Sequence, residues 1–256
     1  LNKIFSNIAQ DTTHASVEVG NTSEMRDELS KFFVFDGIER NDDGTVTKGV
    51  TVTKVAAQGN SDTPEWATTG ENITSDVTVK VVDDKITVTG FDYSSADNCV
   101  VKKTGTGWQG HKLVLSFNVN PNVNCHDWTE AKNYDTNKTT AGSQAGLYYG
   151  DSGSTVVNGS PQVPVPTYRV IYEWGDIKNA TTVTDDQYYI NGQTAQVKGT
   201  VQEGTAVQGN NGQWYRFSGW SENGTDVVDK VGITNCDVTL KPVLTEAYTV
   251  TYTGKE

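Results

Sequence analysis

Short runs in which apolar and polar residues alternate extend over most of this chain, and they limit its fold more than any other feature of the sequence. The clearest runs span residues 46–55, 77–89 and 112–119. A period of two places the apolar side chains on one face of a β-strand. The residues between the runs are those that tight turns require, and Asp42–Gly44 and Asp83–Asp84 are predicted to be hairpin turns.

The composition points to the same fold class. Thr, Asn, Asp, Gly and Val are abundant, whereas Leu, Met and Arg are scarce, a balance that suits β-sheet better than helix. A chain of 256 residues can form one large or two ordinary domains, and the spacing of the turns favours two. We predict an all-β protein in which an immunoglobulin-like β-sandwich precedes a smaller, elongated β-rich module.

Two segments depart from strand periodicity. Residues 1–14 have apolar side chains at helical spacing, at Leu1, Ile4, Phe5 and Ile8, so a short amphipathic helix is predicted there. Such a helix cannot bury its own apolar face and must dock on something else, which suggests the remnant of an upstream domain. A second short helix or turn is predicted at residues 26–31.

A proline-rich stretch, PQVPVPTY at residues 161–168, divides the chain. Proline at alternate positions imposes an extended conformation, so we place a domain boundary near Thr167. The preceding residues 118–160 are polar and predicted to be mostly loop. The expected domains are therefore 1–14, a sandwich at 15–167, a repeat module at 168–247 and the start of another repeat at 248–256, where YTVTY echoes the YRVIY of residue 168. Within the repeat module we expect a core of aromatic residues, comprising Trp174, Trp214, Tyr215, Phe217 and Trp220.

The second module resembles the SHIRT-type repeats of Gram-positive surface adhesins. The residues that carry the likeness are YRVIYEW at 168–174, GQWYRFSGW at 212–220 and DVTLKP at 237–242. The FSGW element is shared with other bacterial surface repeats, including mucin-binding and Listeria-Bacteroides types. The resemblance implies an elongated spacer that projects an adhesive tip from the cell wall.

The first module resembles the β-sandwich domain that follows a von Willebrand factor A domain in many Firmicute cell-wall-anchored proteins. The matching segments are DELSKFFVF at 27–35, KITVTGFDYS at 85–94, GHKLVLSFNVNP at 110–121 and the PQVPVP exit. This resemblance implies that residues 1–14 are the last helix of a von Willebrand factor A fold. It also implies an extracellular, cell-wall-anchored location.

The net charge of −12 argues against nucleic acid and anionic membranes as partners. No apolar run reaches the roughly 20 residues needed to span a bilayer, so we expect a monomeric segment without membrane insertion. Histidines are scattered and the acidic pairs lack EF-hand spacing, so neither a metal nor another cofactor is expected. The motifs of hydrolases and phosphate loops are absent, and GDSG at 150–153 is interpreted as a turn, so no enzymatic activity is expected.

The three cysteines are too few for a disulfide scaffold. Cys99 and Cys125 fall in one module, where they form either a disulfide or two free thiols. Cys236 is expected to be unpaired and buried.

Surface β-sandwiches of this kind sometimes contain an isopeptide bond between lysine and asparagine, which needs an inward-facing lysine. Lys54, Lys80 and Lys112 lie on or beside predicted strands. Lys80 is out of phase with the neighbouring valines, and we expect Lys54 to face solvent as well. Ordinary solvated lysines are therefore the favoured interpretation.

Aromatic residues in polar surroundings are the candidates for binding. Exposed rings can stack on a sugar or anchor a protein partner, and the candidate residues are Trp108, Trp128, Tyr148 and Tyr149. We expect a non-enzymatic adhesin or stalk segment that contributes to binding a host or microbial surface protein or glycan. The alternatives are a ligand-binding tip that uses residues 118–160, and a carbohydrate-binding module from a secreted enzyme.

Overall fold

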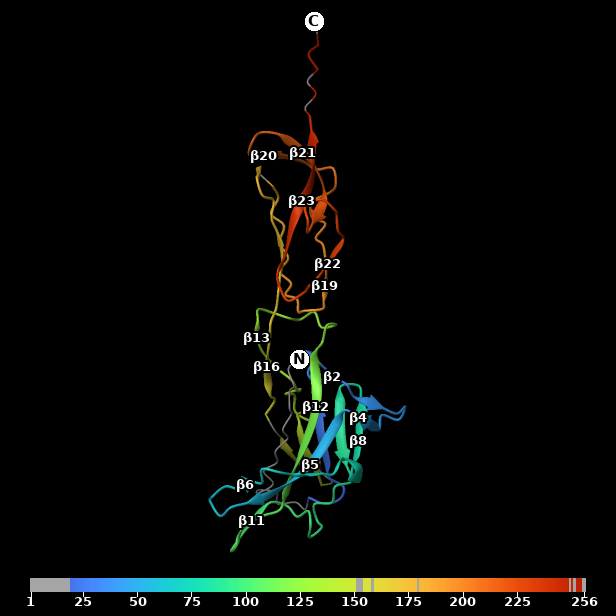
Figure 1. Cartoon of the computed structure of the whole chain (residues 1–256), viewed down its shortest axis with the longest axis vertical. Helices are drawn as coiled ribbons and strands as arrows, with labels where there is room; N and C mark the ends of the chain where they lie inside the picture. The colour runs from blue at the N-terminus through green and yellow to red at the C-terminus, as the bar shows by residue number, and fades with distance from the viewer. Residues whose placement is uncertain are drawn as a thin grey trace. The chain divides into compact units, whose positions relative to one another are not determined.

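The computed structural model describes residues 19–150, 154–157, 159–178, 180–248, 250 and 252–254. Strands dominate this part of the chain, so the all-β prediction is confirmed (Figure 1). The helix predicted at 1–14 lies outside the described residues.

The chain divides into a first unit, Leu1–Asn122 with Asn133–Val163, and a second unit, Val123–Lys132 with Pro164–Glu256. The main division lies between Val163 and Pro164, and residues 123–132 group with the second unit.

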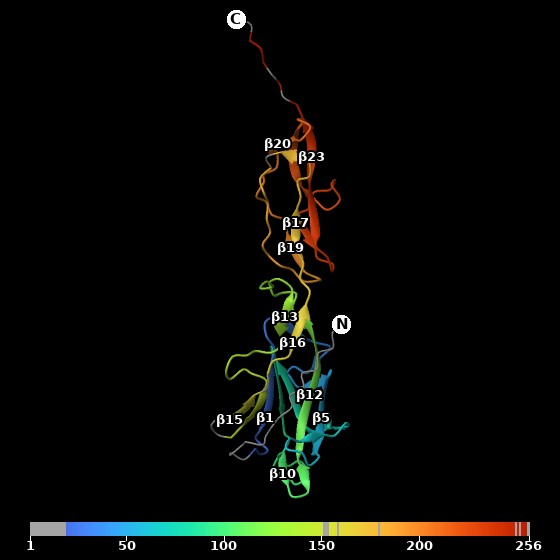
Figure 2. The ribbon, with the colours of Figure 1, turned by 90° about the vertical axis from the view of Figure 1, so that its left-hand side faces the viewer.

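The first unit is a β-sandwich of two five-stranded sheets, seen as two layers in Figure 2. One sheet has the order β15 (Ser154–Val157), β14 (Gly146–Tyr149), β1 (Glu24–Glu28), β9 (Lys85–Thr89) and β8 (Thr78–Val82). The other has the order β2 (Phe33–Asp36), β12 (His111–Pro121), β5 (Val50–Gln58) and β6 (Glu65–Trp66), with β7 (Glu71–Asn72) also on β5.

Smaller elements complete the description of the first unit and its border. They are the pair β3 (Glu39–Arg40) and β4 (Val46–Lys48), the pair β10 (Lys102–Thr104) and β11 (Gly107–Gln109), the pair β13 (Lys132–Asp135) and β16 (Gln162–Val165), and the 3-10 helix η1 (Thr74–Asp76).

Strand β12 shows why the alternating sequence forms this sandwich. Its buried side chains are Leu113, Leu115, Phe117 and Val119, separated by half-buried residues. β12 pairs with β5 from His111↔Ala56 to Phe117↔Val50, so the inward residues of the two strands form one continuous apolar face. Burying each large apolar side chain contributes about 1.5–3 kcal/mol relative to exposure.

Most of residues 26–31 do not form the predicted short helix or turn, because Glu24–Glu28 form β1; Lys31 lies in the turn that follows. Met25, Asp27 and Leu29 are buried in alternation, so the segment has strand periodicity with a carboxylate at an inward position. The Asn137 side chain donates from Nδ2 to Asp27 Oδ2 at 3.2 Å. Because the inward position of Asp27 is polar and is matched by Asn137, the spacing of apolar residues did not predict strand β1.

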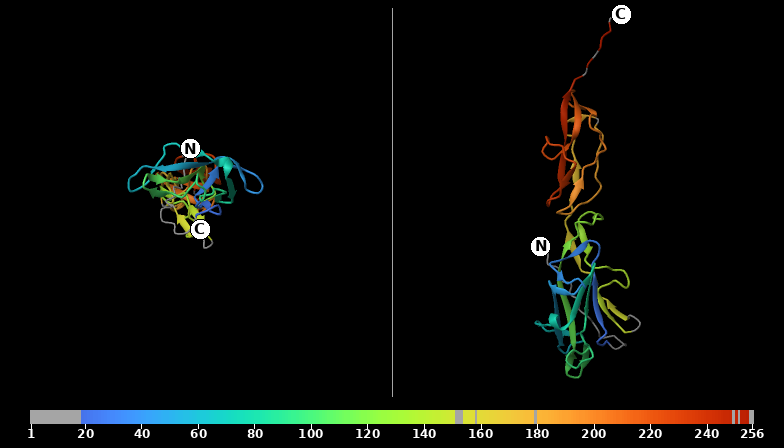
Figure 3. Two further views of the ribbon diagram at one scale, coloured as in Figure 1. Left: turned by 90° about the horizontal axis from the view of Figure 1, so that it is seen from below. Right: turned by 90° about the vertical axis from the view of Figure 1, so that its right-hand side faces the viewer.

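The second unit contains a five-stranded sheet and a two-stranded one, shown from opposite sides in Figures 2 and 3. The larger sheet has the order β17 (Val170–Tyr172), β23 (Val238–Ala247), β21 (Trp214–Ser221), β20 (Ala206–Gly209) and β18 (Ile177–Lys178). The smaller sheet pairs β19 (Thr194–Gln196) with β22 (Lys230–Gly232). β17 and β23 are parallel, whereas β23–β21, β21–β20 and β20–β18 are antiparallel.

The core of the second unit is built around an aromatic cluster. Phe217 and Trp220 are buried, and the half-buried Trp174 and Tyr172 pack on them with ring centroids 4.8–5.3 Å apart. Trp214 was predicted to belong to this core, but its side chain is 41% exposed. Trp214 points to the opposite face of β21 from Phe217, because the strand alternates.

Across the described parts of the chain, no helix has the length and apolar character needed to cross a membrane.

The packing of β12 gives a stability prediction. Replacing the fully buried Leu115 by alanine should lower the free energy of unfolding of the first unit by about 2–5 kcal/mol, because the methyl groups leave a cavity. The matched control is Val114→Ala on the other face of the same strand, where the side chain is half-buried. Urea unfolding followed by circular dichroism measures both, and equal losses in the two variants would contradict the assigned register.

Candidate functional site

The aromatic residues predicted to bind a ligand are mostly buried. Trp128, Tyr148 and Tyr149 are 3%, 7% and 8% exposed, so the expectation of exposed rings at these positions is wrong. The two tyrosines lie in β14, between β1 and β15, so they belong to the body of a sheet and not to a loop. Tyr148 is fixed further, since its hydroxyl donates to Gln144 O at 2.7 Å and the Arg26 guanidinium lies 4.2 Å from its ring.

Trp108 is half-buried in β11 and is held by a neighbouring loop. Its backbone N–H donates to Gly59 O and its Nε1 donates to Ser61 O, both at 2.9 Å. Trp108 therefore lies in a different sheet from Tyr148 and Tyr149, which belong to β14.

The cysteines are all free thiols, so the structure does not contain the Cys99–Cys125 disulfide. The carbonyl of Cys99 accepts a hydrogen bond from His111 N at the start of β12, whereas Cys125 follows the end of that strand. At about 3.4 Å per residue the strand separates its two ends by some 35 Å, far beyond the roughly 7 Å limit between bridged Cα atoms. The expectation that Cys236 is buried is also wrong, because this residue is exposed.

The three candidate lysines for an isopeptide bond all have polar or aromatic neighbours. Lys80 pairs with Asp43 at 3.3 Å, and Lys112 Nζ lies 4.3 Å from the centroid of the Trp66 ring. Burial lowers the pKa of Lys112.

Lys54 is the lysine that differs most from its prediction. Its side chain is only 17% exposed, because Lys54 shares the inward parity of Val50 and Val52 and the phase of the strand changes after it. Its Nζ lies 2.8 Å from Glu71 Oε2 and 3.4 Å from Asn98 Oδ1. The hydrogen bond from Lys54 lowers the pKa of Glu71, so the amine faces a charged carboxylate. An ammonium ion is not a nucleophile, so this arrangement favours an ion pair over an amide bond.

Within the described ranges, no group of three or more His, Cys, Asp or Glu side chains is arranged to hold a metal ion.

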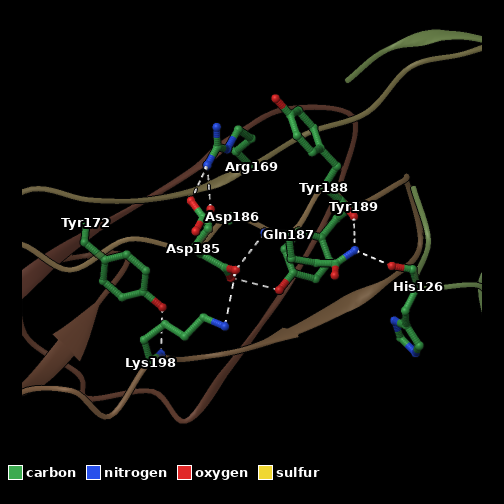
Figure 4. A network of polar contacts seen from close by, with 9 residues as sticks. All are labelled: His126, Arg169, Tyr172, Asp185, Asp186, Gln187, Tyr188, Tyr189 and Lys198. Atoms are coloured by element: carbon green, nitrogen blue, oxygen red, sulfur yellow. Dashed lines mark hydrogen bonds and ion pairs between the residues drawn. The ribbon is translucent and has the colours of Figure 1, made fainter. Parts of the chain in front are cut away.

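The most extensive polar arrangement lies in the second unit and holds residues 123–132. Gln193 is buried, and its Nε2 donates to Val123 O and Cys125 O, both at 2.8 Å. Its Oε1 accepts from Ile190 N at 2.9 Å. Gln187 Nε2 donates to His126 O at 2.7 Å (Figure 4). Two glutamine side chains thus supply the hydrogen bonds that a neighbouring strand would otherwise give to this backbone.

A buried carboxylate positions the loop that carries Gln187. Asp185 is 2% exposed, and its Oδ2 accepts from the Tyr189 hydroxyl at 2.9 Å. Its Oδ1 accepts from Gln187 N at 3.1 Å and lies 3.3 Å from Lys198 Nζ. Figure 4 shows these contacts converging on the carboxylate. Burial of a charge is costly unless it is paired and hydrogen-bonded, and both conditions are met here.

Two further contacts attach this loop to the sheet. Arg169 Nη2 donates to Asp185 O at 2.6 Å, and its guanidinium lies 5.0 Å from the Tyr188 ring. Tyr172, at the end of β17, accepts a hydrogen bond from Lys198 N at 2.7 Å. The network therefore connects the first strand of the second unit with the loop that binds residues 123–126.

The chemistry of this network is that of a scaffold. Burial is the largest cause that raises the pKa of Tyr189, and the hydrogen bond to Asp185 raises it further. The hydroxyl therefore remains a proton donor at neutral pH. Both carboxylate oxygens of Asp185 already accept hydrogen bonds from the chain. Gln187 and Gln193 were not predicted from the sequence, because nothing in a single sequence marks a glutamine whose side chain will bond to a distant backbone segment.

No model of a known protein family matches the chain. A search of curated proteins also finds no match.

The contacts of Lys54 make a mass prediction. The intact wild-type chain should have the mass of the plain sequence, because no ammonia is lost in isopeptide formation. Mass spectrometry of wild type and Lys54→Arg should then differ only by the two side chains. A wild-type mass that is lower by one ammonia, with no such deficit in the variant, would contradict the ion-pair assignment.

The contacts of Gln193 make a stability prediction. Gln193→Ala should destabilise the second unit by about 1–3 kcal/mol, because Val123 O, Cys125 O and Ile190 N lose their partners in a buried setting. Chymotrypsin should also cleave faster at Trp128. The control is Gln196→Ala, an exposed glutamine in β19, which should change neither the unfolding midpoint nor the cleavage rate.

The raised pKa of Tyr189 gives a pH prediction. An unfolded tyrosine ionises near its usual pKa of 10.0, whereas the folded Tyr189 stays protonated to higher pH. The stabilisation is therefore complete below pH 10 and is lost as the pH rises above it. Tyr189→Phe should be less stable than wild type at pH 7 but should lose less stability between pH 9 and pH 11, as measured by urea titration. Some alkaline loss should remain, because burial also raises the pKa of Tyr93 and of Tyr172.

Proposed function

We propose that this chain is a non-enzymatic, load-bearing segment of a bacterial cell-surface adhesin. The observation that carries the proposal is the parallel pairing of β17 with β23, the first and last strands of the second unit. The adhesin family and the cell-wall location rest on the resemblance of the sequence segments described above.

The parallel pair determines how the second unit responds to tension. Its register is Val170↔Val238, Ile171↔Thr239 and Tyr172↔Leu240, extended by hydrogen bonds from Val238 N to Arg169 O and from Glu173 N to Leu240 O. A force applied along the chain pulls the start of β17 and the end of β23 in opposite directions. All the bonds between parallel strands are then loaded together in shear, whereas an antiparallel terminal pair can open one bond at a time.

Neighbouring contacts reinforce the same strands. β23 also pairs with β21, from Trp214↔Ala247 to Ser221↔Lys241, so that β23 has a neighbouring strand on both sides. On β17, the Tyr172 ring packs edge-on against Trp220 at 4.9 Å. Asp237 Oδ1 accepts a hydrogen bond from Arg169 N at 2.9 Å. These interactions support a spacer in which β17 and β23 resist separation when the chain is pulled from its ends.

The alternative of a ligand-binding tip made from residues 118–160 receives less support. Strands β13 and β14 occupy part of that stretch, and residues 123–126 are hydrogen-bonded to Gln187 and Gln193. Much of the backbone expected to be available for a ligand is therefore already engaged.

Single-molecule force spectroscopy tests the proposal. With the full chain pulled from its ends, Glu173→Pro should lower the unfolding force of the second unit, because proline removes the N–H that bonds to Leu240 O. Equilibrium stability should fall by about 1 kcal/mol. Glu173→Ala keeps the N–H and replaces the same exposed side chain, so its unfolding force should equal that of wild type. Equal forces for Glu173→Pro and wild type would overturn the load-bearing role of this pair.

A further inference from the structure

The second unit contains a cavity of about 520 Å³ that lies outside the polar network. It is formed by residues in and before β18, by the turn that follows β20, and by residues of β21 and β23. Strands β20, β21 and β23 lie together at the upper end of Figure 1. The side chains used in the argument below are Trp174, Asp176, Asn210, Asn211, Tyr215 and Leu244. None of them was singled out as a binding residue by the sequence.

The apolar wall of the cavity is held in place by the core. The Trp174 ring packs against Phe217 and Trp220 at 5.3 and 4.8 Å, and its Nε1 donates to Thr181 O at 2.9 Å. Tyr215 has the same strand parity as the buried Phe217, so it points to the core side of the sheet. Leu244, the partner of Phe217 in β23, packs on the same core. Two aromatic residues, together with the aliphatic Leu244 and Ile177, therefore line a preformed hollow.

The polar wall is equally ordered. Asn210 N donates to Asp176 O at 2.8 Å, and Gln213 N donates to Asn211 Oδ1 at 2.9 Å. Gly209 is required in this turn, since a Cβ there would lie 2.6 Å from Asn211 Oδ1 and 3.1 Å from the Tyr215 ring. The side chains of Asp176 and Asn210 are exposed at the edge of the cavity, where they are accessible to a ligand.

We propose that this cavity binds a neutral saccharide. A pyranose ring presents an apolar face that can pack on Trp174 and Tyr215, and its hydroxyl groups can donate to the Asp176 carboxylate. The Asn210 amide both donates and accepts, as a hydroxyl or acetamido group requires. The volume lies within the range of small-molecule sites. Asp176 and the net charge of −12 disfavour acidic sugars.

This inference does not depend on the proposed load-bearing role. It also places the carbohydrate contact at residues other than Trp108, Trp128, Tyr148 and Tyr149, the candidates predicted from the sequence. A spacer unit with its own sugar site would contribute to adhesion along its length in addition to any contact at a tip.

The test is an NMR titration of the full chain with N-acetylglucosamine, galactose and N-acetylneuraminic acid as probes. At least one neutral sugar should shift the Trp174 indole N–H resonance saturably, whereas the acidic sugar should not. Asp176→Ala and Asn210→Ala should each weaken the binding about tenfold, the loss expected for one hydrogen bond involving a charged or well-ordered group. Both replace exposed side chains, and circular dichroism checks that the fold is retained.

Trp214→Ala is the matched control, because this exposed tryptophan lies next to Tyr215 on the other face of β21. Binding should be unchanged in this variant. The proposal is overturned if no neutral sugar shifts the Trp174 resonance, if Asp176→Ala and Asn210→Ala bind as tightly as wild type, or if the acidic sugar binds as well as the neutral ones.

Discussion

The buried carboxylate of Asp185 is the contact on which the organisation of the second unit depends. Its oxygens accept hydrogen bonds from Tyr189 and from the backbone of Gln187, and Lys198 supplies the opposite charge. An isolated carboxylate in this position would cost several kcal/mol in lost hydration. These contacts hold the loop that carries Gln187, and the Gln187 side chain donates a hydrogen bond to His126 O. The hydrogen bond from Arg169 Nη2 to Asp185 O links this loop to the start of β17, the strand that would be loaded under tension.

Strand content was predictable because it depends on a local pattern. The alternating residues of β12 and β9 bury every second side chain, as the sequence indicated. The predictions of strands and of side-chain orientation failed where a polar side chain occupies an inward position. Asp27 in β1 and Lys54 in β5 are both largely buried, and each is matched by a partner from a distant part of the chain, Asn137 and Glu71. A single sequence does not show these partners, so the inward polar residue looks like a break in the strand or a solvent-exposed position.

The candidate site was harder to predict for a related reason. Trp128 stands among polar residues and is buried, whereas Trp214 stands among aromatic residues and is exposed. Neighbours in sequence did not decide either case: strand parity exposes Trp214, and the packing of residues 123–132 buries Trp128. The cavity beside Trp174 is likewise assembled from four separate segments, so no single stretch of sequence contains it.

The placement of residues 123–132 in the second unit has a consequence for folding during synthesis. Gln193, which binds the carbonyl of Cys125, follows it by 68 residues in the chain. When this segment emerges from the ribosome, Gln187 and Gln193, which hydrogen-bond to it, have not yet been synthesised. Residues 123–125 therefore stay without these hydrogen bonds until Gln193 has been synthesised, although the chain of the first unit is complete at Val163.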